Sequence, residues 1–192
     1  PLQSLNISGG SLTIDTPERT SLSPNYQLNG LYGMEGIYLK NISLNIIGIN
    51  SNGLEQWVRN IQYGNSVNEQ GNYIFRLSGG GYIVAGTKQI SHWYDLLMMK
   101  VNNDGTQSSS WSFGGSYNEV GNFAQEVSGG YIVSGSTESY GQGLYDAWVV
   151  KTNDDGEEIY NHTFGGSLDD EALGGVKSIN GDPVIAGYTK SF

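Results

Sequence analysis

The segment Gly129-Gly130-Tyr131-Ile132-Val133-Ser134-Gly135 decides the fold, because it repeats an earlier segment, Gly80-Gly81-Tyr82-Ile83-Val84-Ala85-Gly86. A weaker copy follows as Gly181-Asp182-Pro183-Val184-Ile185-Ala186-Gly187. The copies are spaced by about fifty residues. A fixed period of 20–50 residues is the signature of repeat architectures, in which each unit is one supersecondary module.

Two further elements recur in the same order and at the same period. The first is Asp95-Leu96-Leu97-Met98-Met99-Lys100-Val101-Asn102-Asn103-Asp104-Gly105, with a close copy over 146–156 and a degraded one over 43–53. The second is Phe113-Gly114-Gly115-Ser116, which returns as Phe164-Gly165-Gly166-Ser167. Three elements in constant order indicate true repeats rather than a composition effect.

Each period predicts strands and turns and contains no helical pattern. Short runs rich in Val, Ile, Tyr and Trp alternate with Gly, Asn, Asp and Ser, which is typical of strands joined by tight turns. Asn-Asp-Gly at 103–105 and Asp-Asp-Gly at 154–156 predict hairpin turns, since Gly accepts a positive φ. The third unit has four predicted strands, at 122–127, 131–136, 147–152 and 158–164.

A four-stranded sheet cannot bury both faces alone, and stacking such sheets around an axis gives a β-propeller. We therefore predict an all-β propeller of about four blades in one domain over 1–192. The blades are expected at about 21–64, 72–115, 122–166 and 172–192 together with 1–15. The last blade contains only two predicted strands, at 173–178 and 184–189. Either N-terminal strands, at 5–8 and 12–15, or a neighbouring chain would complete it. A larger ring of two chains, or a fragment of a longer propeller, is a further alternative.

The three repeated elements together resemble a family of secreted β-propellers whose tandem repeats occur in surface and extracellular proteins of archaea and bacteria. The resemblance covers about 79–192 and is weaker before that, where Leu31-Tyr32-Gly33-Met34-Glu35-Gly36 replaces the usual strand and Gly48 replaces Lys. It implies an extracellular or cell-surface scaffold for binding or assembly, and the family has no shared catalytic set to carry over.

Composition narrows the classes of function. Nine Lys and Arg against nineteen Asp and Glu give a formal net charge of −10, which disfavours nucleic acid and anionic lipid as partners. There is no cysteine, so disulfides and thiolate-bound zinc are excluded. The longest apolar run is too short to predict membrane insertion. We expect no cofactor.

Few residues suggest chemistry. His92 and His162 are about seventy positions apart, so we expect neither a histidine metal site nor a triad. The acidic turns fit hairpin chemistry better than a calcium loop, whose ligands alternate. Asp169-Asp170-Glu171 has counterparts in Asn118-Glu119 and Asn68-Glu69, which indicates a structural role. We predict no catalytic residues and no metal ligands.

The leading prediction is a non-enzymatic structural or adhesive protein that binds further copies or another surface protein. The alternative is a carbohydrate-binding propeller, because aromatic side chains between the second and third strands of a unit could stack on sugar rings. Its predicted ligand-binding residues are Trp93, Tyr94 and Tyr145. A glycoside hydrolase using paired carboxylates ranks third. Three sequons mark candidate N-glycosylation sites at Asn6, Asn41 and Asn161.

Overall fold

A computed structural model describes residues 4–8, 11–15, 44–61 and 68–191 of the chain. Within this described part there are fourteen β-strands, arranged in five antiparallel sheets, and no helix. The predicted all-β class is therefore confirmed, and no sheet closes on itself among these residues. The chain divides into two compact units, Pro1–Tyr38 and Leu39–Phe192.

The described residues of the first unit form a hairpin of β1 (Ser4–Ser8) and β2 (Ser11–Asp15). The two strands pair in antiparallel register, with Ser8 opposite Ser11. Strands were expected at 5–8 and 12–15, so both predictions are confirmed, and each strand begins one residue earlier.

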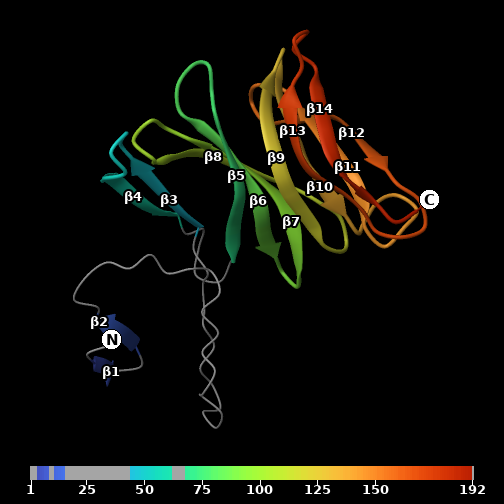
Figure 1. Ribbon diagram of the computed structural model, residues 1–192. Helices are drawn as coiled ribbons and strands as arrows, with labels where there is room; N and C mark the ends of the chain where they lie inside the picture. The colour runs from blue at the N-terminus through green and yellow to red at the C-terminus, as the bar shows by residue number, and fades with distance from the viewer. Residues whose placement is uncertain (1–3, 9–10, 16–43, 62–67, 192) are drawn as a thin grey trace. The chain divides into compact units, whose positions relative to one another are not determined.

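Two four-stranded meanders form the centre of the second unit (Figure 1). The first contains β5 (Glu69–Arg76), β6 (Tyr82–Ile90), β7 (Trp93–Val101) and β8 (Gln107–Phe113). The second contains β9 (Glu119–Val127), β10 (Gly130–Thr137), β11 (Asp146–Thr152) and β12 (Glu158–Phe164). Four strands per period, as the repeats predict, are confirmed for both.

Two half-sized sheets complete the described part of this unit. One pairs β3 (Leu44–Ile49) with β4 (Glu55–Ile61), and the other pairs β13 (Asp170–Lys177) with β14 (Pro183–Thr189). In the repeat, β3 and β4 occupy the positions of a third and fourth strand. In contrast, β13 and β14 occupy those of a first and second strand.

The hairpin turns after the third strand of a unit form as predicted. Gly105 and Gly156 have φ of 81° and 82°, a left-handed conformation that glycine adopts without steric cost. The Asn153 side chain closes the second turn, because its Oδ1 accepts the backbone N–H groups of Asp155 and Glu157 at 3.0 and 2.9 Å. The predicted hairpin turn is thus closed by hydrogen bonds from backbone N–H groups to the Asn153 side chain.

The recurring glycine at the end of the repeated segment has a different cause. A methyl group added to Gly86, Gly135 or Gly187 would overlap a backbone carbonyl of the neighbouring strand, belonging to Gln70, Val120 and Glu171 respectively. Next to each glycine the pairing register shifts by one residue, which marks a β-bulge in the first strand of the unit. The glycine permits the two backbones to approach at that bulge.

Successive sheets pack face to face, and the sheet β5–β8 carries an apolar cluster on each of its two faces. One apolar cluster lies between the sheets β5–β8 and β9–β12 and includes Ala85, Met98, Val133 and Trp148. A second lies on the opposite face of β5–β8, where Leu44, Ile46 and Ile61 meet Leu97 and Met99. Small Ala85 and bulky Met98 and Trp148 thus share one interface.

The bulged residues of β5 and β9 form hydrogen bonds between neighbouring sheets. Asn72 Nδ2 donates to the Gly121 carbonyl at 3.0 Å, and Asn122 Nδ2 donates to the Ala172 carbonyl at 3.0 Å. These two bonds are one interaction repeated at the period of the sequence. The corresponding residue of the last unit is Leu173, which is 53% exposed and cannot donate such a bond.

Candidate functional site

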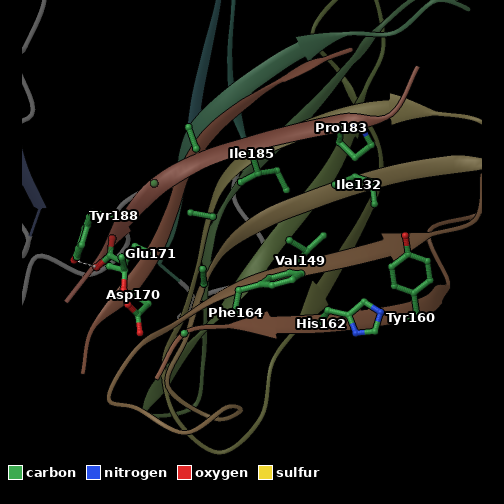
Figure 2. A pocket seen from close by; sticks show the side chains of 16 residues that line it. Ile132, Val149, Tyr160, His162, Phe164, Asp170, Glu171, Pro183, Ile185 and Tyr188 are labelled. Atoms are coloured by element: carbon green, nitrogen blue, oxygen red, sulfur yellow. Dashed lines mark hydrogen bonds between the residues drawn. The ribbon is translucent and has the colours of Figure 1, made fainter. Parts of the chain in front are cut away.

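An apolar groove lies between the sheet β9–β12 and the half sheet β13–β14, with a volume of about 610 Å³ (Figure 2). One wall is formed by side chains of β10, β11 and β12, and the other by β13 and β14. Six side chains make up most of its apolar lining: Ile132, Ala147, Val149, Phe164, Pro183 and Ile185. A groove of this size and character suits a peptide segment or a small apolar ligand.

An aromatic row runs along β12 into the groove. The rings of Tyr160 and His162 have centroids 5.2 Å apart, and those of His162 and Phe164 are 6.5 Å apart. Alternate residues of a strand point to the same face, so all three side chains project toward β13–β14. Phe164 and Tyr160 remain largely exposed.

Comparison with the neighbouring interface explains why the groove exists. In β5–β8, Ile83, Leu96 and Met98 are buried against β9–β12. The corresponding residues of β9–β12 are Ile132, Ala147 and Val149, and they line the groove instead. Only the two strands β13 and β14 cover this face in the part of the chain that the structure describes. The space opposite β11 and β12 is the place of a third and fourth strand.

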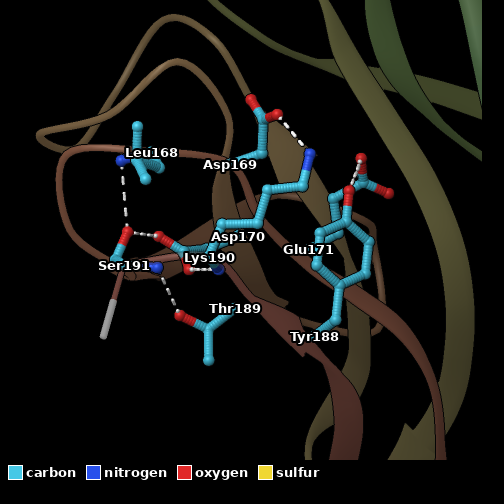
Figure 3. A network of polar contacts seen from close by, with 8 residues as sticks. All are labelled: Leu168, Asp169, Asp170, Glu171, Tyr188, Thr189, Lys190 and Ser191. Carbon is cyan, nitrogen blue, oxygen red and sulfur yellow. Dashed lines mark hydrogen bonds and ion pairs between the residues drawn. The ribbon is translucent and has the colours of Figure 1, made fainter.

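A polar network holds the end of the half sheet (Figure 3). Asp170 is buried, and its carboxylate accepts the Gly166 N–H, the Lys190 N–H and the Ser191 hydroxyl at 2.8, 3.1 and 2.6 Å. Hydrogen bonds from the side chains of Ser191 and Thr189 lower the Asp170 pKa to about 2. Nearby, the Tyr188 hydroxyl donates to Glu171 at 2.8 Å, which raises the Tyr188 pKa.

The same carboxylate position recurs in the other units. Glu119 accepts the Thr137 hydroxyl and the Gly115 N–H at 2.9 and 3.0 Å, and Glu69 lies 3.4 Å from Lys88. All three acids are buried at the start of a first strand. Glu119 and Asp170 therefore hold turns through backbone N–H groups, in keeping with the structural role expected from their repetition, whereas Glu69 forms an ion pair with Lys88 on the neighbouring strand.

One pair of acids lies close together without taking part in the groove. Burial raises the Asp95 pKa, and the neighbouring Glu119 charge raises it further. A side chain at Gly114 would touch both carboxylates, which explains the glycine of the Phe-Gly-Gly-Ser element. No group of three or more His, Cys, Asp or Glu side chains converges among the described residues.

The predicted ligand-binding aromatics gather around the turn that precedes β9. The Tyr94 N–H donates to Asn118 Oδ1 at 3.2 Å, and Asn118 Nδ2 donates to Glu138 Oε2 at 2.8 Å. Burial, followed by the Glu138 charge, raises the Tyr145 pKa. Tyr94 and Tyr145 are both partly buried, and they pack beside the turn that contains Asn118.

Trp93 is the exposed member of the predicted set. Its ring lies 5.4 Å from that of Tyr117 in an edge-to-face arrangement, and the two side chains are 43% and 51% exposed. Sequence reasoning missed Tyr117, because it follows the Phe-Gly-Gly-Ser element in a different turn. Its place just before the repeated Asn-Glu pair is the only signal that could have identified it.

The remaining candidates are dispersed. His92 lies in the turn between β6 and β7, and His162 lies on the exposed surface of β12, as expected. Asn161 is exposed, and its side chain bonds to Glu158 at 2.6 Å and accepts the Trp148 Nε1–H at 3.2 Å. Asn6 lies in β1, and Asn41 lies outside the described residues. Among the described residues there is no helix that could span a membrane.

Comparison with known proteins adds no assignment. No protein-family model matches the chain, and no curated protein shows a significant match to it.

Proposed function

We propose that this chain is a non-enzymatic structural or adhesive β-propeller protein of the cell surface or extracellular space, which assembles with further copies or with another surface protein. Two interior sheets of identical topology, stacked by a repeated apolar interface, support blade-like packing. The hydrogen bonds from Asn72 and Asn122 support it further, because equivalent residues join each sheet to the next one in the same way.

The proposed ring contains about four blades per chain. Its last blade has β13 and β14 as first and second strands, and it is completed either by N-terminal strands or by a neighbouring chain. Completion of this kind removes exposed strand edges, which otherwise promote uncontrolled association.

The apolar groove beside β13–β14 is the observation that carries this proposal. Its lining repeats the residues that form a protein–protein-like interface one unit earlier, between β5–β8 and β9–β12. Sheet faces of this composition are normally covered by other strands. A surface shaped for a strand pair indicates a role in binding polypeptide rather than in transforming a small substrate.

Sedimentation velocity over a wide range of protein concentration tests the proposed function. We expect reversible growth of the particle with concentration. The variant Val149→Arg, which places a charge in the groove, should reduce that growth. Leu144→Arg, at an exposed position of the loop before β11 that does not line the groove, is the matched control. A chain that stays monomeric at every concentration and also fails to bind surface proteins would contradict the proposal.

Carbohydrate binding is the second candidate, favoured by the exposed Trp93–Tyr117 pair. Two adjacent aromatic faces with nearby amide and carboxylate groups can hold a sugar ring. Glycan-array binding that is lost in Trp93→Ala and kept in Tyr160→Ala would support it. Binding that survives Trp93→Ala would remove this pair from consideration.

A further inference from the structure

We propose that the groove receives β3 and β4 of a second copy, so that β14 of one copy pairs antiparallel with β3 of the next. The product is a complete four-stranded sheet, in the order β13–β14–β3–β4, shared by two chains. From the described strands β3–β14, each copy then contributes two four-stranded sheets of its own and one shared sheet, in place of the four blades proposed for one chain. This inference rests on the proposed function and specifies its partner: another copy of this chain, added head to tail.

The repeat positions of the strands in the two half sheets favour this partner. By repeat position, β13 and β14 are the first half of a unit, and β3 and β4 are the second half. In the part of the chain that the structure describes, β14 pairs with β13 alone and β3 pairs with β4 alone. Within one copy the two halves lie on either side of the stacked sheets β5–β8 and β9–β12 (Figure 1), so they meet only between copies.

The register of the new pair follows from the existing ones. Second and third strands pair with Val133 opposite Val150 in one unit and with Val84 opposite Met99 in the other. The corresponding residues are Ile185 on β14 and Ile47 on β3. We therefore place Ile185 of one copy opposite Ile47 of the second copy.

The faces of β3 agree with this placement. Leu44 and Ile46 are buried against the sheet β5–β8 of their own chain. Ile47 and Ile49 point the other way and are 58% and 65% exposed. The residue equivalent to Ile47 is Val150, which is fully buried against the preceding sheet. In the shared sheet, Ile47 and Ile49 would enter the groove, and removing these apolar side chains from water would favour the assembly.

Steric reasoning excludes the symmetric alternative. If two copies paired β14 with β14, a two-fold axis normal to the sheet would relate them, because antiparallel pairing keeps the same face on the same side. Both copies of β9–β12 would then lie under the same four strands and collide. Pairing with β3 avoids this, since β9–β12 of one copy and β5–β8 of the other lie on opposite faces of the shared sheet. The contact is heterologous, so the assembly is a ring or a filament.

Cysteine cross-linking tests the register directly, because the natural chain has no cysteine. Residues directly opposite on paired strands have Cβ atoms about 4.5–5.5 Å apart, close to disulfide geometry. Ile47→Cys and Ile185→Cys are prepared as separate proteins, one carrying a size tag, mixed, and oxidised. We expect a mixed dimer as the dominant product, and a ladder of covalent oligomers from the doubly substituted chain.

Val184→Cys is the matched control, since Val184 adjoins Ile185 but points to the opposite face. Its yield of mixed dimer with Ile47→Cys should be at least tenfold lower. Circular dichroism of each variant verifies the fold. Self-association in sedimentation without the 47–185 cross-link overturns this inference and leaves the proposed function standing. Absence of both association and cross-link overturns the inference together with self-assembly.

Discussion

At the scale of single residues, Asp170 shows how a buried acid ties a turn to a strand. Its folded pKa of about 2 lies below the ordinary value of 3.8. The stabilisation it provides is therefore complete above about pH 4 and is lost as the pH falls through 2. We expect the urea midpoint of unfolding to decline over this range, and to decline less in Asp170→Asn, which should be less stable at pH 7.

Asp169→Asn is the control for that prediction. Asp169 pairs with Lys190 at 2.8 Å, but both side chains are partly exposed, and exposed ion pairs contribute only about 0–1 kcal/mol. Its midpoint should follow that of the natural chain at every pH. Equal pH profiles for Asp170→Asn and the natural chain would show that the Asp170 bonds do not stabilise the fold.

The role of a residue could be predicted where the same residue type recurs at the same position of each repeat. The recurrence of an acid at 69, 119 and 170 indicated a structural role, and each of these side chains is buried at a strand start. The Trp93–Tyr117 pair was half predicted, because contact between turns of different units depends on the offset of stacked sheets. A single sequence gives the period of the repeat but not that offset.

At the scale of the strand, the glycine that closes the repeated segment sets the approach of neighbouring backbones. A methyl group at Gly135 would overlap the Val120 carbonyl, and overpacking of this kind costs about 1–3 kcal/mol. We expect Gly135→Ala to lower the free energy of unfolding by that amount. Gly174→Ala is the control, since nothing lies within 4 Å of the added group. Similar urea midpoints for both variants would contradict the close approach.

The bulge beside that glycine supports a second strand-scale prediction. Asn122→Ala removes the bond to the Ala172 carbonyl between two sheets, and such bonds contribute about 0.5–1.5 kcal/mol. Chemical denaturation should detect this loss. Leu173→Asn changes the equivalent bulge of the last unit, where the side chain is exposed, and should leave the midpoint unchanged in dilute protein, before copies associate. A destabilising Leu173→Asn would show that this face is covered in solution.

Strand positions were predicted almost completely, and their ends less well. The expected strand at 122–127 begins three residues earlier, at Glu119. Polar Glu119 and the glycine at 121 obscured the start, because neither favours a strand on its own. Their burial is imposed by the Thr137 bond and the bulge, which are tertiary effects that local sequence does not carry.

At the scale of the whole molecule, the sequence predicted identical strand modules stacked on their faces, and both interior sheets have this form. The order of the strands, and the place of β13 and β14 as the first and second strands of the last unit, followed from counting repeats. The groove did not, because it depends on how far β13 and β14 cover the stacked face of β9–β12. That coverage is a property of the packed sheets and not of the repeat pattern.

Hydrogen exchange measured by mass spectrometry at two protein concentrations connects that groove to assembly. In dilute protein β10, buried throughout, should exchange slowest, and the exposed strands β12 and β14 should exchange fast. Above the association threshold, β14 and β3 should gain protection together, since each supplies half of the new pairing. Ile47→Lys should abolish the gain in both strands while leaving β10 unchanged. Protection that instead appears around Trp93 and Tyr117 would place the contact between copies at the aromatic pair.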